Sequence, residues 1–118
     1  MSLGVTPGEI NIEEFQRVDI RVGRILEARQ LVGARKPAYE LHIDFGPHLG
    51  VKQSSAQITV RYAPEELLGR LVLAVVNFPP RRIAGFRSEV LTLGVPDEGG
   101  NVVLISPTAE VPLGGRLF

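Results

Sequence analysis

The residues best suited to holding a ligand lie in the stretch 76–89, VNFPPRRIAGFRSE. Consecutive Pro79 and Pro80 fix two φ angles and remove two backbone donors, so we expect a stiff loop that presents its side chains at low entropic cost. The polar side chains that follow are Arg81, Arg82, Arg87 and Ser88. Guanidinium groups on a preorganised loop suit phosphate and base recognition, and Phe78 or Phe86 is available for stacking. The same residues fit a packed barrel end equally well, with the phenylalanines as plugs and the arginines solvated.

A second polar stretch, 48–59, reads HLGVKQSSAQIT. Its lysine, two glutamines and two adjacent serines can donate hydrogen bonds to phosphates, base edges or peptide carbonyls. The alternative is a hydrogen-bonded turn between strands, and the spacing alone favours the turn.

Catalytic chemistry has few candidates in this chain. His42 and His48 flank Asp44, and on a strand His42 and Asp44 point to the same side. Such residues can ligate a metal, but solvent-facing polar side chains are the default explanation. The nucleophile-elbow, phosphate-loop and dinucleotide-binding motifs are absent, and no cysteine is present to form a disulfide or a thiolate metal site. We therefore expect a protein that is not an enzyme and that holds no metal or cofactor.

The composition fits one soluble domain with a modest core. The 118 residues are 44% hydrophobic and 22% charged, as in ordinary globular proteins, and a partner chain would add burial to so short a chain. The N-terminus lacks the basic and apolar regions of a secretory leader, and the longest apolar run, 71–76, is too short to span a bilayer. We expect a cytoplasmic protein without membrane insertion, with a loosely ordered lead-in over residues 1–10.

The charges balance overall but not locally. Thirteen basic and thirteen acidic residues give a net charge of zero, which argues against strong sequence-independent affinity for nucleic acid. Residues 15–95 nevertheless contain 12 bases and 7 acids. This local excess forms either a basic face or an unpatterned surface, and the sequence leaves both open.

Alternating apolar residues indicate β-strands. Two runs, 18–25 (VDIRVGRI) and 39–46 (YELHIDFG), show the period of two that half-buried strands require. In the first run the phase slips by one residue at Gly23, which predicts a β-bulge or a sharp bend there. Further strands are expected at 57–60, 71–78, 90–95 and 102–105. Short strands at this spacing predict an all-β barrel or sandwich.

The run 71–78, LVLAVVNF, is apolar at both odd and even positions, so both of its faces should be covered. We expect a helix or a second subunit to supply the outer cover. Two short helices are predicted, at 11–18 and 63–69. Asn11 is the expected N-cap of the first, and Pro64 occupies the first helical position of the second.

Four stretches of the chain closely resemble the CsaA-like export-related chaperones, a branch of the tRNA-binding-domain family. These are FQRVDIRVGRI (15–25), AYELHIDFG (38–46), VKQSSAQIT (51–59) and AVVNFPPRRIAGFRSEVLTLG (74–94). The resemblance implies a single domain over residues 11–118: a five-stranded oligonucleotide-binding (OB-fold) barrel with short helices. It also implies that N- and C-terminal extensions form a homodimer interface.

Two ligand classes are implied by the resemblance. The wider family binds tRNA on the barrel face, and CsaA-like proteins bind unfolded or export-bound polypeptides. The candidate nucleic-acid or peptide contacts are Lys52, Gln53, Ser54, Ser55, Asn77, Arg81, Arg82, Arg87 and Ser88. The candidates for an apolar pocket are Phe15, Phe45, Ile58, Phe78 and Phe86.

Three hypotheses follow. The first is a non-enzymatic homodimeric chaperone for unfolded or secretory polypeptides, with tRNA-binding capacity on the barrel face. The second is a free-standing tRNA-binding module that uses the same loops. The third, with the least support, is a small metal-dependent enzyme built on His42, Asp44 and His48. The near-neutral charge predicts that any RNA affinity is modest and sensitive to salt.

Overall fold

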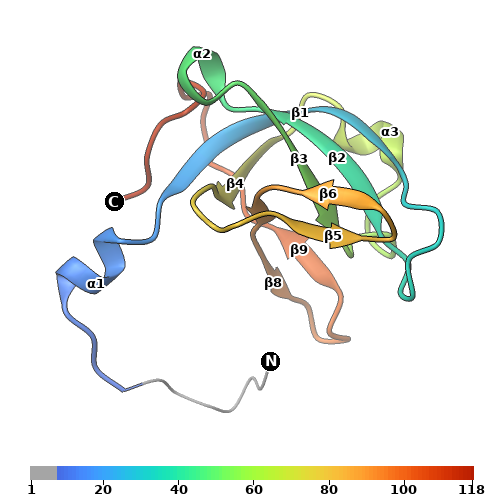
Figure 1. Ribbon diagram of the computed structural model, residues 1–118, viewed down its shortest axis with the longest axis horizontal. Coiled ribbons are helices and arrows are strands. Elements are labelled where there is room, and N and C mark those ends of the chain that lie inside the picture. Colours follow the sequence, from blue (N-terminus) through green and yellow to red (C-terminus); the bar gives the residue numbers. More distant parts are fainter. Residues whose placement is uncertain (1–7) are drawn as a thin grey trace.

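Five antiparallel strands curl into a nearly closed barrel in the computed structural model, which describes residues 8–118 (Figure 1). The order along the sheet is β3-β2-β1-β4-β7. These strands are β1 (Ile20–Gln30), β2 (Tyr39–Asp44), β3 (Val51–Ala56), β4 (Leu71–Val75) and β7 (Leu91–Thr92). The predicted all-β architecture with a five-stranded barrel is confirmed.

Two hairpins and three short helices complete the described part of the chain. One hairpin joins β5 (Arg81–Ile83) to β6 (Phe86–Ser88), and the other joins β8 (Gly94–Pro96) to β9 (Val102–Leu104). The helices are α1 (Ile12–Gln16), α2 (Gly46–Leu49) and α3 (Pro64–Leu67).

Local sequence explains where the helices begin. The Asn11 side chain accepts a hydrogen bond from the N–H of Glu14, and the Glu14 carboxylate accepts one from the N–H of Asn11. This capping box confirms the predicted N-cap of α1. Pro64 opens α3 as expected. The sequence patterns do not predict α2, which starts at Gly46 with a φ of 88°.

Gly23 permits a close approach of core side chains rather than a bulge. The register between β1 and β2 shifts between Ile25 and Glu27, so the predicted irregularity is present but its position at Gly23 was wrong. A Cβ atom on Gly23 would lie 2.5 Å from Cγ2 of Ile43 and 2.7 Å from Cε1 of Phe45. Glycine is therefore required here because the barrel core leaves no room for a side chain.

Strand β4 is buried on both faces, as its sequence predicts. Val72 and Ala74 face the barrel core. Leu71, Leu73 and Val75 belong to a second apolar cluster, whose other members are Ile20, Val22, Leu93, Ile105 and Leu113. The expected helix or second subunit was wrong, because the chain's own later segments supply the outer cover.

Polar side chains close the barrel between β3 and the segment around β7. Ser54 is fully buried and shares a 2.8 Å hydrogen bond with the hydroxyl of Thr92. The N–H of Gln53 donates to the Glu89 carboxylate at 3.0 Å, and the carbonyl of Gln53 accepts from the N–H of Glu89 at 2.8 Å. Because a serine takes the inward position, β3 has no apolar alternation. The strand expected at 57–60 was wrong for this reason, and the true strand is β3.

Other predicted boundaries also change. The strand expected at 71–78 ends as β4 at Val75, before the proline pair. The run expected at 90–95 is divided into β7 and β8, because Leu93 turns away from the barrel and packs in the outer cluster. The run 102–105 contains β9.

The N-terminal lead-in expected over residues 1–10 falls mostly outside the described residues, which begin at Gly8. Residues 8–10 precede α1 without forming a helix or strand. No helix within residues 8–118 has the length and apolar character needed to cross a membrane.

Replacing Gly23 by alanine should destabilise the protein by about 1–3 kcal/mol, because the added methyl overpacks the core against Ile43 and Phe45. Urea unfolding followed by circular dichroism measures the change. Gly8→Ala is the matched control, since a Cβ at Gly8 meets no atom within 4 Å. Equal unfolding midpoints for Gly23→Ala and Gly8→Ala would contradict this account of the core.

Candidate nucleic-acid interface

The stretch 76–89, expected to be a stiff loop, contains the β5–β6 hairpin. The paired residues across it are Arg81 with Ser88, Arg82 with Arg87, and Ile83 with Phe86. Ala84 and Gly85 form the turn with φ values of 52° and 82°, positive at both positions as in type I′ hairpin turns. Strand pairing therefore adds to the stiffness that Pro79 and Pro80 supply.

Two arginines of the hairpin face each other on its exposed side. Arg82 and Arg87 are directly opposite in the register, and both are exposed. Like charges at opposite positions destabilise a strand pair. Arg82 also donates a 3.3 Å hydrogen bond to the carbonyl of Gly85. An anion bound beside the hairpin would relieve this repulsion.

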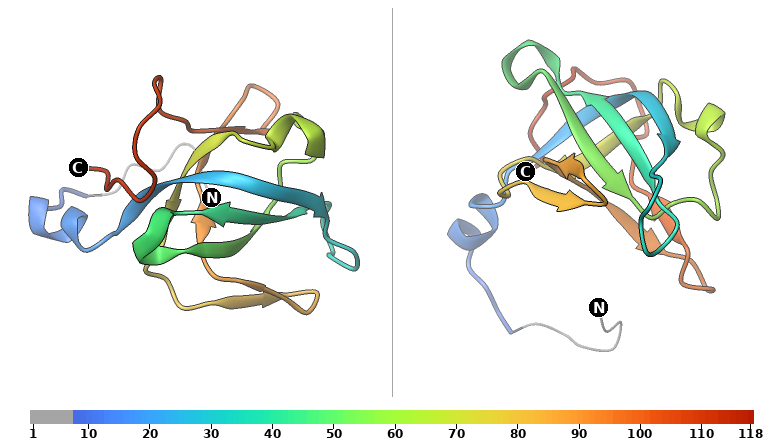
Figure 2. Two further views of the ribbon diagram at one scale, coloured as in Figure 1. Left: turned by 90° about the horizontal axis from the view of Figure 1, so that it is seen from above. Right: turned by 45° about the vertical axis from the view of Figure 1, so that its right-hand side comes forward.

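The hairpin is fastened to β3, beside which it lies in both views of Figure 2. The N–H of Ser55 donates to the Ser88 hydroxyl at 3.0 Å, and the two hydroxyls lie 3.3 Å apart. Ser88 also donates to the carbonyl of Val90 at 3.4 Å. The barrel seam and the position of the hairpin thus depend on neighbouring serines of β3, Ser54 and Ser55.

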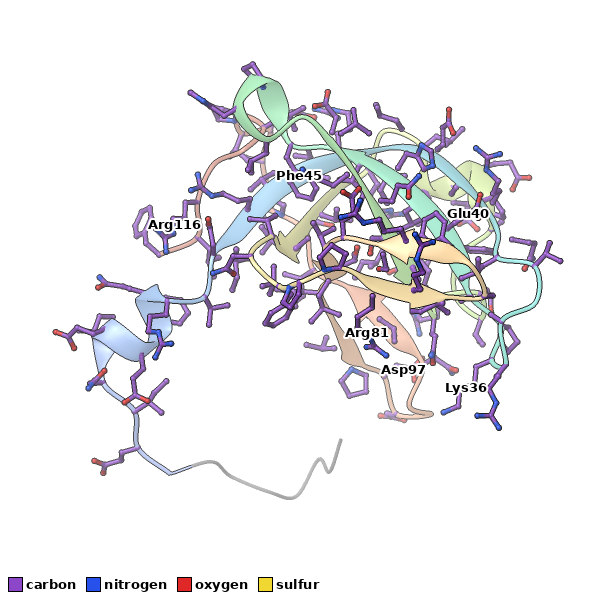
Figure 3. All side chains as sticks on the ribbon, in the orientation of Figure 1. Lys36, Glu40, Phe45, Arg81, Asp97 and Arg116 are labelled. Atoms are coloured by element: carbon purple, nitrogen blue, oxygen red, sulfur yellow. The ribbon has the colours of Figure 1, made fainter. Side chains whose placement is uncertain are left out.

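A basic groove of about 690 Å³ separates the hairpin from the loop between β1 and β2. Figure 3 labels Lys36 on this loop and Arg81 on the hairpin. We call this space the basic groove. Its lining residues are Gly33, Ala34, Arg35, Lys36, Ala38, Ser55, Gln57, Arg81, Arg82, Ile83 and Ala84.

Four of these lining residues are basic and none is acidic. Within residues 8–118, Arg35, Lys36, Arg81 and Arg82 have no carboxylate within ion-pair distance. Uncompensated guanidinium and ammonium groups around one groove favour a polyanion, and arginines can hold phosphate oxygens with two hydrogen bonds.

Arg35 and Lys36 were missed by the sequence analysis. They form a basic pair between Gly33 and Pro37, in the loop that joins the first two barrel strands. In five-stranded OB barrels, the loop between strands 1 and 2 and the loop between strands 4 and 5 are usual ligand-binding loops. The position of the loop between the first two barrel strands, together with its two adjacent basic residues, could have identified Arg35 and Lys36 from the sequence.

The candidate polar contacts divide into residues that line the basic groove and residues that do not. Arg81, Arg82 and Ser55 line the basic groove. Lys52 and Gln53 lie on β3 outside that groove, and Ser54 is buried in the barrel seam.

Asn77 has a structural role at the base of the hairpin. Its Oδ1 accepts from the N–H of Asp19 at 3.0 Å, and its Nδ2 donates to the carbonyl of Arg17 at 2.8 Å. These bonds tie the segment after α1 to the chain just before the two prolines.

The apolar candidates also separate. Phe45, 1% exposed, and Ile58 lie in the barrel core. Phe86 is half-buried on the hairpin, and Phe15 lines a groove between the chain termini. Phe78 is 51% exposed and lines a pocket of about 140 Å³ with Pro79, Ile83 and Leu91. Phe78 is therefore the candidate with the most free apolar surface.

Two of the three residues of the metal hypothesis, His42 and Asp44, have other partners. Nδ1 of His42 lies 3.6 Å from a carboxylate oxygen of Glu27, and the Asp44 carboxylate accepts from the N–H of Gly46 at 2.9 Å. His48 lies on α2. Among residues 8–118, no three histidine, cysteine, aspartate or glutamate side chains gather closely enough to hold a metal ion.

The chain is similar to known proteins in sequence and in fold. Residues 20–116 match the family described as "Putative tRNA binding domain". The chain is 52% identical to the chaperone CsaA of Bacillus anthracis, with a TM-score of 0.88 over 94% of this chain and 100% of that one. It is 46% identical to the CsaA chaperone protein of Picrophilus torridus, with a TM-score of 0.87 over 93% of this chain and 100% of that one.

Methionine–tRNA ligases are also similar in sequence. The ligase of Porphyromonas gingivalis is 38% identical over 109 residues, which are 92% of this chain and 16% of the ligase. The chain thus spans only a small part of the length of these curated relatives.

Proposed function

We propose that this chain, which belongs to the tRNA-binding domain family, is a non-enzymatic binding protein that holds tRNA in the basic groove. The observation that carries the proposal is the convergence of four bases and no acid around that groove. The bases come from a loop and a hairpin that are far apart in sequence, so the barrel is what brings them together.

Rigidity supports this function. Arg81 and Arg82 start a paired strand directly after two prolines, so little backbone freedom is lost when they meet a phosphate. The zero net charge of the chain limits long-range attraction. We therefore expect modest affinity with a clear dependence on salt, and a cytoplasmic location where tRNA is present.

A second function, as a chaperone of unfolded or export-bound polypeptides, is favoured by the pocket beside Phe78. This pocket is mainly apolar, and it shares Ser55, Arg81 and Ile83 with the basic groove. The similarity to CsaA chaperones over nearly the whole chain supports the same function. Release of a polypeptide would need no nucleotide, since the sequence contains no phosphate-binding loop.

Homodimer formation through the terminal segments is the third part of the proposal. α1 and the C-terminal segment lie side by side in Figures 1 and 2. A groove of about 320 Å³ between them is lined by Ile12, Phe15, Gln16, Val18, Arg116, Leu117 and Phe118. Ile12 is 61% exposed and Phe118 is fully exposed. A second copy of the chain would bury this apolar surface, which the short chain leaves uncovered.

The double variant Arg81→Ala/Arg82→Ala should bind tRNA at least ~10-fold more weakly than the parent protein, because two phosphate contacts are lost. The slope of log K against log salt should fall by about two. Fluorescence anisotropy with labelled tRNA at several salt concentrations measures both. Arg29→Ala is the matched control, since Arg29 pairs with Glu27 and Glu40 away from the groove. An unchanged slope in the double variant would rule out this mode of binding.

The protein should suppress aggregation of a heat-unfolded client enzyme without ATP. Phe78→Ala should weaken that suppression severalfold, because the substitution removes apolar contact area. Light scattering at fixed client concentration reports the effect. Leu68→Ala, at an exposed position outside the pocket, is the control. No suppression by the parent protein at several-fold excess would count against the chaperone function.

Displacement of tRNA by an apolar peptide would indicate that the residues shared by the basic groove and the Phe78 pocket serve both ligands.

Ile12→Asp should convert a dimer into a monomer, because a carboxylate placed in an apolar contact loses its hydration. Sedimentation equilibrium measures the mass. Val95→Asp, at an exposed position on β8, should remain dimeric. A parent protein that sediments as a monomer at tens of micromolar would disprove the dimer.

A further inference from the structure

A second groove continues the basic groove toward the β8–β9 hairpin. It has a volume of about 290 Å³ and lies among Pro37, the segment that follows β3, and the turn before β9. Lys36 and Gln57 line both grooves, so the two spaces are neighbours. We call the second space the amide groove, after Gln57 and Asn101 in its lining.

The amide groove differs from the basic groove in charge. Its second base, Arg61, donates a 2.8 Å hydrogen bond to the carboxylate of Asp97. This bond, assisted by the backbone N–H of Asn101, holds the pKa of Asp97 below its usual range. The carboxylate therefore stays ionised and neutralises Arg61. Apart from Lys36 at the junction, the charges of the amide groove are compensated.

The polar groups of the amide groove suit a nucleobase. Within residues 8–118 the side chains of Gln57 and Thr59 make no hydrogen bond, and Gln57 offers both a donor and an acceptor. Val60, 73% exposed, and Pro37 add apolar surface beside them. An amide that pairs with a base edge and apolar atoms that cover a base face are the two elements of base recognition.

An unpaired base suits this site better than a paired one. In an RNA duplex the Watson–Crick edges are occupied and the deep, narrow major groove is closed to side chains, so only the minor-groove edges remain in reach. In a single strand the bases are free to turn away from the backbone. A basic groove beside a neutral, amide-lined groove therefore suits a single strand better than a duplex.

We propose that the two grooves form one track for a single-stranded RNA segment. The backbone crosses Arg35, Lys36 and Arg81, and one unpaired base enters the amide groove against Gln57 and Thr59. This inference rests on the proposed function and specifies which part of an RNA the protein holds.

The test uses the full chain and three labelled RNAs: tRNA, a single-stranded 10-mer of mixed sequence, and a duplex of the same sequence. OB folds cover roughly 4–16 nucleotides, so the 10-mer is long enough to span the track. Anisotropy titrations compare the parent protein with Gln57→Ala and with Thr59→Val. Gln30→Ala, an exposed glutamine on β1 that lines neither groove, is the matched control.

We expect the parent protein to prefer the single strand over the duplex. Gln57→Ala should weaken single-strand binding about 10-fold, and Thr59→Val about threefold, since each removes a contact to a base. The salt slope should stay at the parent value in both variants, because neither side chain contacts a phosphate. Duplex affinity should be the same in all four proteins.

Three results would overturn the inference. These are equal affinity for strand and duplex, parent-like strand binding by both variants, or loss of affinity with a reduced salt slope. If tRNA binding still depends on Arg81 and Arg82 in that case, the proposed function stands without the track. Failure of all three RNAs to bind would overturn both. Thermal melting of each variant shows whether a loss of RNA affinity is caused by misfolding. If Gln57→Ala misfolds, Thr59→Val tests the inference, because valine has nearly the same shape as threonine.

Discussion

Leu71, Leu73 and Val75 point away from the barrel interior, and the chain buries them under its own later segments. Three apolar side chains of this size would contribute several kcal/mol when removed from water, which is a large share of the stability of a small domain. Leu113 belongs to this cover, and the bridge between Arg21 and Arg116 continues it along β1. Covering β4 therefore brings the C-terminal segment back to the start of β1. Because α1 precedes β1, the groove between α1 and the C-terminal segment forms there.

The seam between β3 and β7 lies beside β4, and its serines also hold the β5–β6 hairpin. Ser54 fills the seam by bonding to Thr92, while Ser88 bonds to Ser55 and places the β5–β6 hairpin against β3. A hydroxyl network in a seam is stabilising only when each member has a partner. Serines that resemble ligand contacts in the sequence thus hold the hairpin in position beside the basic groove.

Patterns in the sequence were enough to predict the parts of the fold in which one side of an element is apolar. β1, β2 and both predicted helices follow from alternation or capping. β3 could not be found in this way, because its inward Ser54 is satisfied by a hydroxyl 38 residues away. For the site, Arg81 and Arg82 were identified from local stiffness. Arg35 was missed because its loop has no periodicity, and only barrel closure brings it opposite the hairpin.

A chain of zero net charge can still attract a polyanion when its acids are committed elsewhere. Asp19 pairs with Arg21 and Arg116, Glu110 pairs with Arg24, and Asp97 pairs with Arg61. None of these carboxylates lines the basic groove. Because the Debye length is about 8 Å at physiological salt, a bound phosphate responds mainly to charges in its immediate surroundings. The excess of basic residues around the groove, and not the net charge of the chain, decides what the groove attracts.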